Sequence, residues 1–162
     1  MNLHSERTML KNALFGNYAI GAFNFSNMTM LRAIVDAANE EKSPVILAVS
    51  ESAFKIVSPQ FLRRLIQAVM EDASVPIALH LDHGKTIDAV QSALDIGFNS
   101  IMIDGSSKPF NENVELTSKV VEICHKYDAS VEGELGRLAG IEDDVKVKNA
   151  DAMYTDPQEA QY

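Results

Sequence analysis

Five short apolar runs, each followed by a polar side chain, constrain the fold of this chain more than any other feature. Segments with the apolar spacing of helices separate the runs, a rhythm typical of parallel strands joined by helical crossovers. The runs cover residues 19–23, 44–49, 76–81, 100–103 and 131–133, and the polar residues that end them are Asn24, Ser50, Asp82, Asp104 and Glu134.

Alternation along the runs places these polar residues on one face of the predicted sheet. In the third run Leu79 and Leu81 share one face, while His80 and Asp82 share the other, because successive side chains of a strand point to opposite sides. The fourth and fifth runs alternate in the same way. The aliphatic face would pack under helices, and the polar ends would meet at the mouth of a sheet or barrel, where such folds place their chemistry.

The order of elements predicts an α/β fold. We expect strands at 19–24, 44–50, 75–82, 99–104 and 130–135, helices at 5–15, 27–42, 59–72, 86–97 and 111–127, a polar loop at 136–153 and a further helix from 155. A complete TIM (β/α)8 barrel has eight strand–helix units in about 250 residues. This chain holds about four and a half. We therefore predict that residues 1–162 form a single domain, the N-terminal portion of such a barrel.

Composition excludes several classes of protein. A net charge of −9 argues against a nucleic-acid-binding surface, which needs a basic stripe. No apolar run approaches the ~18 residues of a membrane span, and Ser5 opens a helix rather than a signal peptide. The single cysteine, Cys124, is expected in the core of a helix and gives no disulfide framework. We expect a soluble cytoplasmic protein.

The most informative local pattern is His80-Leu81-Asp82-His83-Gly84. Imidazole is the commonest ligand of a catalytic divalent metal, and a carboxylate beside such a ligand can move a proton. Gly84 is expected to let the backbone turn after the strand. His80 faces the inner side and is expected to be hydrogen-bonded rather than to bind metal. The structural alternative is a His–Asp pair that only caps the next helix.

Together with four other motifs, this pattern resembles the class II ketose-bisphosphate aldolases, and the similarity runs from residue 8 to residue 162. The resemblance implies a zinc-dependent lyase of carbohydrate metabolism that reversibly cleaves tagatose or fructose 1,6-bisphosphate to dihydroxyacetone phosphate and glyceraldehyde 3-phosphate. The four other motifs are Ala22-Phe23-Asn24, Ser100-Ile101-Met102-Ile103-Asp104-Gly105-Ser106, Val131-Glu132-Gly133-Glu134-Leu135-Gly136 and Glu142-Asp143-Asp144.

The same resemblance implies a role for each site residue. His83 would bind the catalytic zinc, and Asp82 would move the proton of the substrate's C4 hydroxyl. Asp104 and Glu134 would hold a second or alternative metal position. Glu142, in the loop, would take the C3 proton of dihydroxyacetone phosphate.

Substrate contacts and partners follow from the resemblance as well. Asn24 and Ser50 would contact the phosphorylated sugar. Zn²⁺ would be the cofactor, with a second divalent or a monovalent cation as a further candidate, and a lysine Schiff base is not needed. We expect a homodimer or homotetramer, with an accessory subunit left open, and no nucleic-acid or membrane partner.

Each role has a structural alternative. Asp104 could cap the turn that follows it, Glu134 could be a solvated strand end, and Glu142 could be ordinary loop charge. Asn24 and Ser50 could be turn residues.

Two departures from the family pattern limit the prediction. Ala139 stands where the family usually has glycine, which makes left-handed backbone angles costly there. The family's other zinc histidines come from later strands, so we expect residues 1–162 alone to be inactive. Two other functions stay open: a catalytically inactive partial barrel that acts as a structural or partner-binding chain, and a different metal-assisted barrel enzyme.

Overall fold

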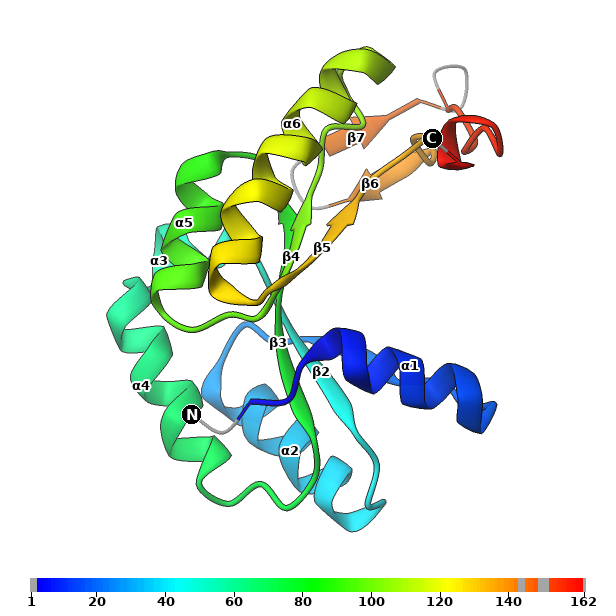
Figure 1. Ribbon diagram of the computed structural model, residues 1–162. Coiled ribbons are helices and arrows are strands. Elements are labelled where there is room, and N and C mark those ends of the chain that lie inside the picture. The colour runs from blue at the N-terminus through cyan, green and yellow to red at the C-terminus, as the bar shows by residue number, and fades with distance from the viewer. Residues whose placement is uncertain (1–2, 143–144, 149–151, 162) are drawn as a thin grey trace.

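The computed structural model describes residues 3–142, 145–148 and 152–161, and its centre is an open sheet of five parallel strands. The strands lie side by side in chain order, as the predicted partial barrel requires, and each predicted strand is present with shifted ends (Figure 1). Their bounds are β1 (Gly21–Asn24), β2 (Val45–Ser50), β3 (Ile77–Gly84), β4 (Ser100–Ile103) and β5 (Ser130–Gly133).

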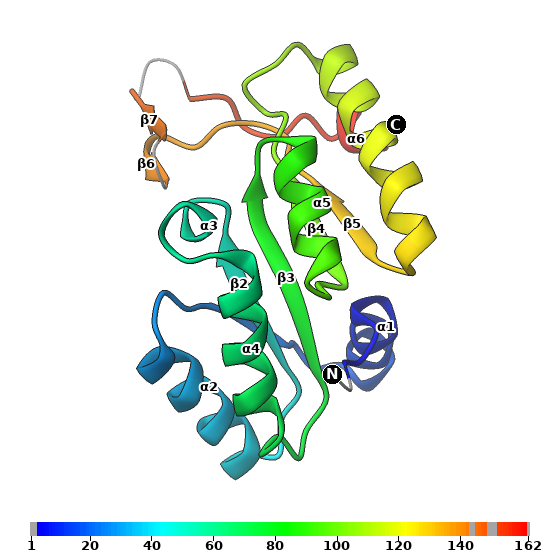
Figure 2. The same ribbon diagram turned by 90° about the vertical axis from the view of Figure 1, so that its left-hand side faces the viewer.

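Helices cover the two faces of this sheet unequally. Four long helices lie on one face, the outer face (Figure 2), whereas α1 (Glu6–Gly16) is the one α-helix of the described residues on the other, the inner face (Figure 1). No helix in the described ranges is long and apolar enough to cross a membrane. The outer helices are α2 (Met28–Glu40), α4 (Pro59–Met70), α5 (Ile87–Asp95) and α6 (Phe110–Cys124).

The predicted alternation is confirmed by the packing of the two faces. Leu47, Leu79 and Ile101 are fully buried in the main core, which lies between the sheet and the outer helices. On the inner face, the alternate residues Ile46 and Ala78 form a second, smaller cluster with Met9 of α1. The outer face therefore holds most of the apolar packing, and the inner face also carries polar side chains such as His80 and Ser100.

Local sequence signals set the ends of several helices. The side chains of Asn27 and Thr86 accept hydrogen bonds from backbone N–H groups in the first turns of α2 and α5. After α5, Gly97 takes a left-handed backbone with φ 99°, as predicted for a helix stop. Cys124 is fully buried in α6, and burial raises the pKa of its thiol to about 11, as a core residue requires.

The structure corrects the prediction after β5. The expected loop at 136–153 contains an antiparallel hairpin of β6 (Gly140–Glu142) and β7 (Val145–Val147). Left-handed angles in this segment fall on Gly136 and Gly140 rather than Ala139. The helix expected from 155 is only a short 3₁₀ turn, η3 (Glu159–Gln161).

Two further differences concern helices. The expected helix at 111–127 ends at Cys124 and continues as a 3₁₀ turn, η1 (His125–Tyr127). The sequence reasoning also missed α3 (Ala53–Ile56), a single turn after β2. A four-residue helix is too short to show an apolar period, so the sequence carried no signal for it.

Candidate active site at the carboxyl end of the sheet

Strand β3 contains a β-bulge at the motif that the sequence singled out. Its pairing with β4 runs to Leu81, skips two residues and resumes at Gly84. The two skipped residues, Asp82 and His83, therefore lie opposite a single residue of β4. A bulge of this kind bends the strand and re-aims a side chain, and it is frequent next to active sites.

The residue that the bulge re-aims is His83. Plain alternation would send its side chain to the outer face with Leu81. Its backbone is instead left-handed, with φ 48°, and its Nδ1 lies 3.1 Å from Oδ2 of Asp104, within hydrogen-bond distance. A left-handed residue other than glycine costs about 1–2 kcal/mol. Strain of this kind persists mainly where surrounding structure enforces it, often at functional sites.

Gly84 has a different role from the predicted one. The left-handed turn lies at His83, and Gly84 remains within the strand. A Cβ on Gly84 would lie 2.8 Å from both the backbone oxygen of Met102 and the Leu81 side chain. Glycine is therefore required here by the close approach of β4, and its carbonyl accepts a hydrogen bond of 2.8 Å from the N–H of Asp104.

Charges around His83 favour its protonated form. Burial lowers the pKa of His83, but the hydrogen bond with Asp104 and the charges of Asp82, Asp104 and Glu134 outweigh burial, so the pKa is raised. For Asp104 burial acts in the opposite direction and raises the pKa. Hydrogen bonds from Ser106 and His83 outweigh this effect, so the pKa of Asp104 is lowered. The backbone N–H of Ser106 donates to Asp104 Oδ1 at 3.0 Å, so Asp104 both caps the following turn and holds His83.

Asp82 is held by a residue at the end of β1, two strands away in the sheet. The side-chain amide of Asn24, at the end of β1, donates to Asp82 Oδ2 at 2.6 Å. Ser50, at the end of β2, is the register partner of Asp82, and its hydroxyl hydrogen-bonds that of Ser52 at 2.7 Å. The three predicted residues thus lie on adjacent strand ends, with Asn24 orienting the carboxylate.

Glu134 is fixed at the end of β5 through its backbone. The side-chain amide of Asn113, on α6, donates to the carbonyl oxygen of Glu134 at 2.7 Å. Asn113 is buried, and Gly105 packs so closely against it that a Cβ there would overlap the amide oxygen. Asn113 therefore ties the end of β5 to the loop after β4. Sequence reasoning missed Asn113, although a polar residue facing the core from the apolar stripe of a helix is a recognisable signal.

Glu142 lies in β6 of the hairpin, on the side of the molecule where the strands end (Figure 2). Its backbone pairs with Val145, but its side chain, like Asp143 and Asp144, lies outside the described part of the structure. Its proton-transfer role stays a prediction.

Of the three predicted metal ligands, the structure brings His83 and Asp104 into contact and puts Glu134 close enough for its charge to act on His83. Within the described ranges, no group of three candidate ligand side chains could by itself hold a metal ion. When its Nδ1 carries the proton toward Asp104, a neutral His83 keeps its Nε2 lone pair for a cation. These donors fit one part of a metal site and need further ligands to complete it.

Comparison with known proteins agrees with this geometry. Residues 4–162 match the family model described as Fructose-bisphosphate aldolase class-II. The chain is 46% identical over 164 residues to fructose-bisphosphate aldolase of Geobacillus stearothermophilus, and 49% identical over 152 residues to that of Thermus caldophilus. These alignments cover 99% and 94% of this chain, and 56% and 50% of the relatives.

Solved structures show the same relationship. The YdjI aldolase of Escherichia coli K12 aligns with a TM-score of 0.81 and 33% identity over 98% of this chain and 55% of that one. A Coccidioides immitis protein assigned as a fructose-1,6-bisphosphate aldolase aligns with a TM-score of 0.86 and 32% identity, over 99% of this chain and 57% of that one. The chain thus spans about half the length of these relatives, and it belongs to the class II fructose-bisphosphate aldolase family.

Proposed function

We propose that this chain supplies the first half of a zinc-dependent aldolase that reversibly cleaves fructose or tagatose 1,6-bisphosphate. The observation that carries the proposal is the bulge of β3, which brings the re-aimed His83 beside Asp82. The bulge presents Asp82 and His83 together at the ends of the strands, and each is held by a partner from another strand. A merely structural His–Asp pair would not need a strained backbone.

Asp82 suits a proton-transfer role. Its Oδ2 accepts a hydrogen bond of 2.6 Å from the side-chain amide of Asn24, which restrains the orientation of the carboxylate. In the proposed reaction this carboxylate takes the C4 hydroxyl proton during cleavage and returns it during condensation. Positioned acid–base groups of this kind contribute about 10²–10⁴-fold to rate.

His83 would hold the metal, with Asp104 and Glu134 at a second or alternative cation position. When bound, zinc supplies Lewis-acid polarisation of a carbonyl oxygen. Asp104 would orient the imidazole through the hydrogen bond that it already makes. Within the described residues no group of three ligands is present, so the proposed zinc site needs ligands from elsewhere.

The remaining assignments belong to the same proposal. Ser50, and Asn24 beside its bond to Asp82, would contact the sugar phosphate, and Glu142 would take the C3 proton of dihydroxyacetone phosphate. We also propose assembly as a homodimer or homotetramer.

A fusion tests the proposal directly. Residues 1–162 are joined to the part of the Geobacillus stearothermophilus relative that follows the aligned region, which gives a chain about as long as that relative. We expect cleavage of fructose or tagatose 1,6-bisphosphate that a chelator abolishes and zinc restores. A folded, zinc-loaded fusion that cleaves neither sugar would refute the proposal.

The isolated chain provides the matching negative prediction. Because one histidine and two carboxylates do not complete a zinc site, we expect no measurable cleavage by purified residues 1–162. Robust cleavage that a chelator removes would contradict this expectation.

A second candidate is a partner-binding partial barrel. Tyr18 and Phe23 are exposed beside Ile34 in an apolar groove of about 670 Å³ at the β1 edge of the sheet. A separate polypeptide corresponding to the second half of a relative is the partner that would bury this groove. If the fusion is inactive, binding of that polypeptide to residues 1–162 would favour this function.

A further inference from the structure

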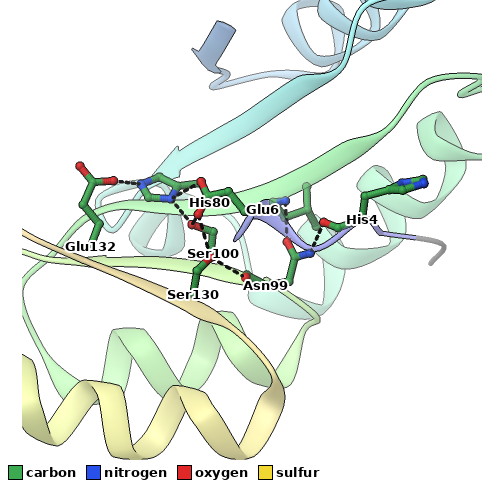
Figure 3. Close-up of polar contacts among 8 residues, drawn as sticks. His4, Glu6, His80, Asn99, Ser100, Ser130 and Glu132 are labelled. Atoms are coloured by element: carbon green, nitrogen blue, oxygen red, sulfur yellow. Dashed lines mark hydrogen bonds and ion pairs between the residues drawn. The ribbon is translucent and has the colours of Figure 1, made fainter. Parts of the chain in front are cut away.

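A largely buried polar cluster lies on the inner face (Figure 3), and its His80 precedes Asp82 by two residues on β3. Its centre is Glu6 of α1, whose Oε2 accepts hydrogen bonds from the hydroxyls of Ser100 at 2.5 Å and Ser130 at 2.7 Å. The Ser100 hydroxyl also lies 2.6 Å from Nδ1 of His80. Glu6, His80 and Ser100 are all buried. The cluster therefore ties α1 to strands β3, β4 and β5 at once.

Counting hydrogens in this cluster assigns the proton of His80. An ionised carboxylate only accepts, and a serine hydroxyl has a single hydrogen to donate. If Ser100 gives its hydrogen to Glu6, its oxygen must accept from His80, so His80 carries a proton on Nδ1. The other ring nitrogen, Nε2, faces Glu132 with its Oε2 at 3.9 Å (Figure 3). Glu6 thus decides, through Ser100, which way the imidazole is held.

The position of His80 links this cluster to the active site. His80 and Ser100 are register partners, and only one more pair follows before the bulge of β3. His80 and Asp82 lie on the same inner face, two residues apart. The hydrogen bond between His80 and Ser100 is therefore the side-chain link between β3 and β4 that lies just below the bulge.

We propose that Glu6 is a positioning residue for the active site, acting through Ser100 and His80 on the bulged end of β3. The proposal rests on the proposed function for its effect on turnover, but not for its effect on the imidazole. Helix α1 precedes the strand–helix repeat, and its Glu6 reaches strands β3, β4 and β5 through this cluster.

Nuclear magnetic resonance of residues 1–162 at pH 8 tests the proton assignment. Ring ¹⁵N shifts should show a proton on Nδ1 of His80 in the unsubstituted chain. In Glu6→Leu the Ser100 hydroxyl is released to donate to the ring, so Nδ1 should lose its proton. Glu6→Gln keeps an oxygen that can accept from Ser100, so Nδ1 of His80 should carry its proton in this variant. Ser130→Ala leaves the bond between Glu6 and Ser100 intact, so Nδ1 should keep its proton there as well. A lone pair on Nδ1 in the unsubstituted chain, or no change in Glu6→Leu, would overturn the proposal.

The same spectra report on the active site. Backbone amide shifts of Asp82, His83 and Gly84 should move in Glu6→Leu and return in Glu6→Gln. Lys11→Ala, on the exposed side of the same helix, should leave them unchanged. If Glu6→Leu does not fold, Ser100→Ala removes the same link and should move the same amides. Unmoved amides in the folded variant would overturn the positioning role.

Turnover by the fusion gives the last readout. We expect kcat of Glu6→Leu to fall about 10–100-fold, the range for groups that orient active-site residues, with KM nearly unchanged and recovery in Glu6→Gln. An unchanged kcat, despite an altered His80 ring, would refute the positioning role. An inactive unsubstituted fusion would count against the proposed function alone, because the ring and amide spectra still decide the role of Glu6.

Discussion

The inner face of the sheet holds two polar clusters, a lower and an upper level, that differ in burial and in backbone geometry. The lower level, comprising Glu6, His80, Ser100 and Ser130, is closed by α1 and linked by short hydrogen bonds. The upper level, comprising Asp82, His83, Asp104 and Glu134, lies at the strand ends and is only partly buried. Of the residues in the two levels, only His83 in the upper one has a left-handed backbone. Both levels are polar, but only the upper one combines exposure with an enforced geometry.

The difference distinguishes polar side chains that hold the fold together from polar side chains that are available for a reaction. Within the described residues, every buried side-chain nitrogen and oxygen has a hydrogen-bond partner. The lower level uses its partners to join elements that are distant in sequence. The upper level uses them to orient side chains that remain reachable from solvent, which is what a reactive group needs.

The strongest test of this difference is Asp82→Ala in the fusion. We expect turnover to fall by ~10²–10⁴, the range for a lost acid–base group, while bound zinc is retained. Steady-state kinetics and metal analysis measure both quantities. Asp88→Ala, at an exposed carboxylate of α5, is the matched control and should keep full turnover. Unchanged turnover in Asp82→Ala would reject the role of Asp82.

His83→Ala should instead weaken zinc binding. We expect a loss of affinity of more than about 100-fold, beyond the range for groups that only orient a ligand. Zinc content after dialysis measures it in the fusion. His125→Ala, at an exposed histidine far along the chain, serves as the control. Full zinc content in His83→Ala would contradict the assignment.

Gly84→Ala tests whether the upper level is held by packing. The new methyl would meet the backbone oxygen of Met102, which cannot move aside as a side chain can. We expect a loss of about 1–3 kcal/mol in the free energy of unfolding, typical of overpacking, measured by urea denaturation. Gly133→Ala meets only the side chain of Thr117, at 3.3 Å, and should cost less. Equal losses of stability in the two variants would show that the contact between Gly84 and the backbone of β4 is not the reason for the loss in Gly84→Ala.

The smallest effect concerns the pair of His83 and Asp104 without metal. Because the pKa of Asp104 is lowered in the folded protein, its stabilisation of the fold is fully present above about pH 4 and is lost as pH falls through that pKa. Because the pKa of His83 is raised in the folded protein, its stabilisation of the fold is fully present below about pH 6.5. That stabilisation is lost as pH rises through the raised pKa.

Asp104→Asn removes the stabilisation from Asp104 and the part of the His83 stabilisation that Asp104 supplies, while the charges of Asp82 and Glu134 remain. We therefore expect it to lower the free energy of unfolding most between about pH 4 and pH 6.5, by roughly 0.2–1 kcal/mol, as for accessible ion pairs. Urea unfolding of the metal-free chain at pH 3, 5 and 8 measures the difference. A loss that is equal at all three values would exclude this pair as its source.

Strand alternation made much of this architecture predictable. The parity of Leu79, His80 and Leu81 fixed which side faces the helices, because the period of a strand is two. The same rule placed Asp82 at the mouth, and the family motifs agreed. The ends of elements were less predictable, since hydrogen bonding rather than hydropathy decides them.

Features that depend on distant contacts were not predictable. The bulge at Asp82 and His83 has no local sequence signature. His83 was therefore expected at the mouth, but its left-handed backbone was not. Glu6 and Ser100 are 94 residues apart and meet only when α1 covers the inner face. The hairpin after β5 was missed because its strands are three residues long, too short for an alternating pattern to stand out.

The buried Cys124 has a practical consequence for all of these experiments. It is the single cysteine of the chain, and a thiol pKa of about 11 leaves almost none of it as thiolate at neutral pH. Alkylating reagents should therefore modify it only when α6 detaches from the sheet. The rate of that modification reports local opening between α6 and β5, without an introduced cysteine.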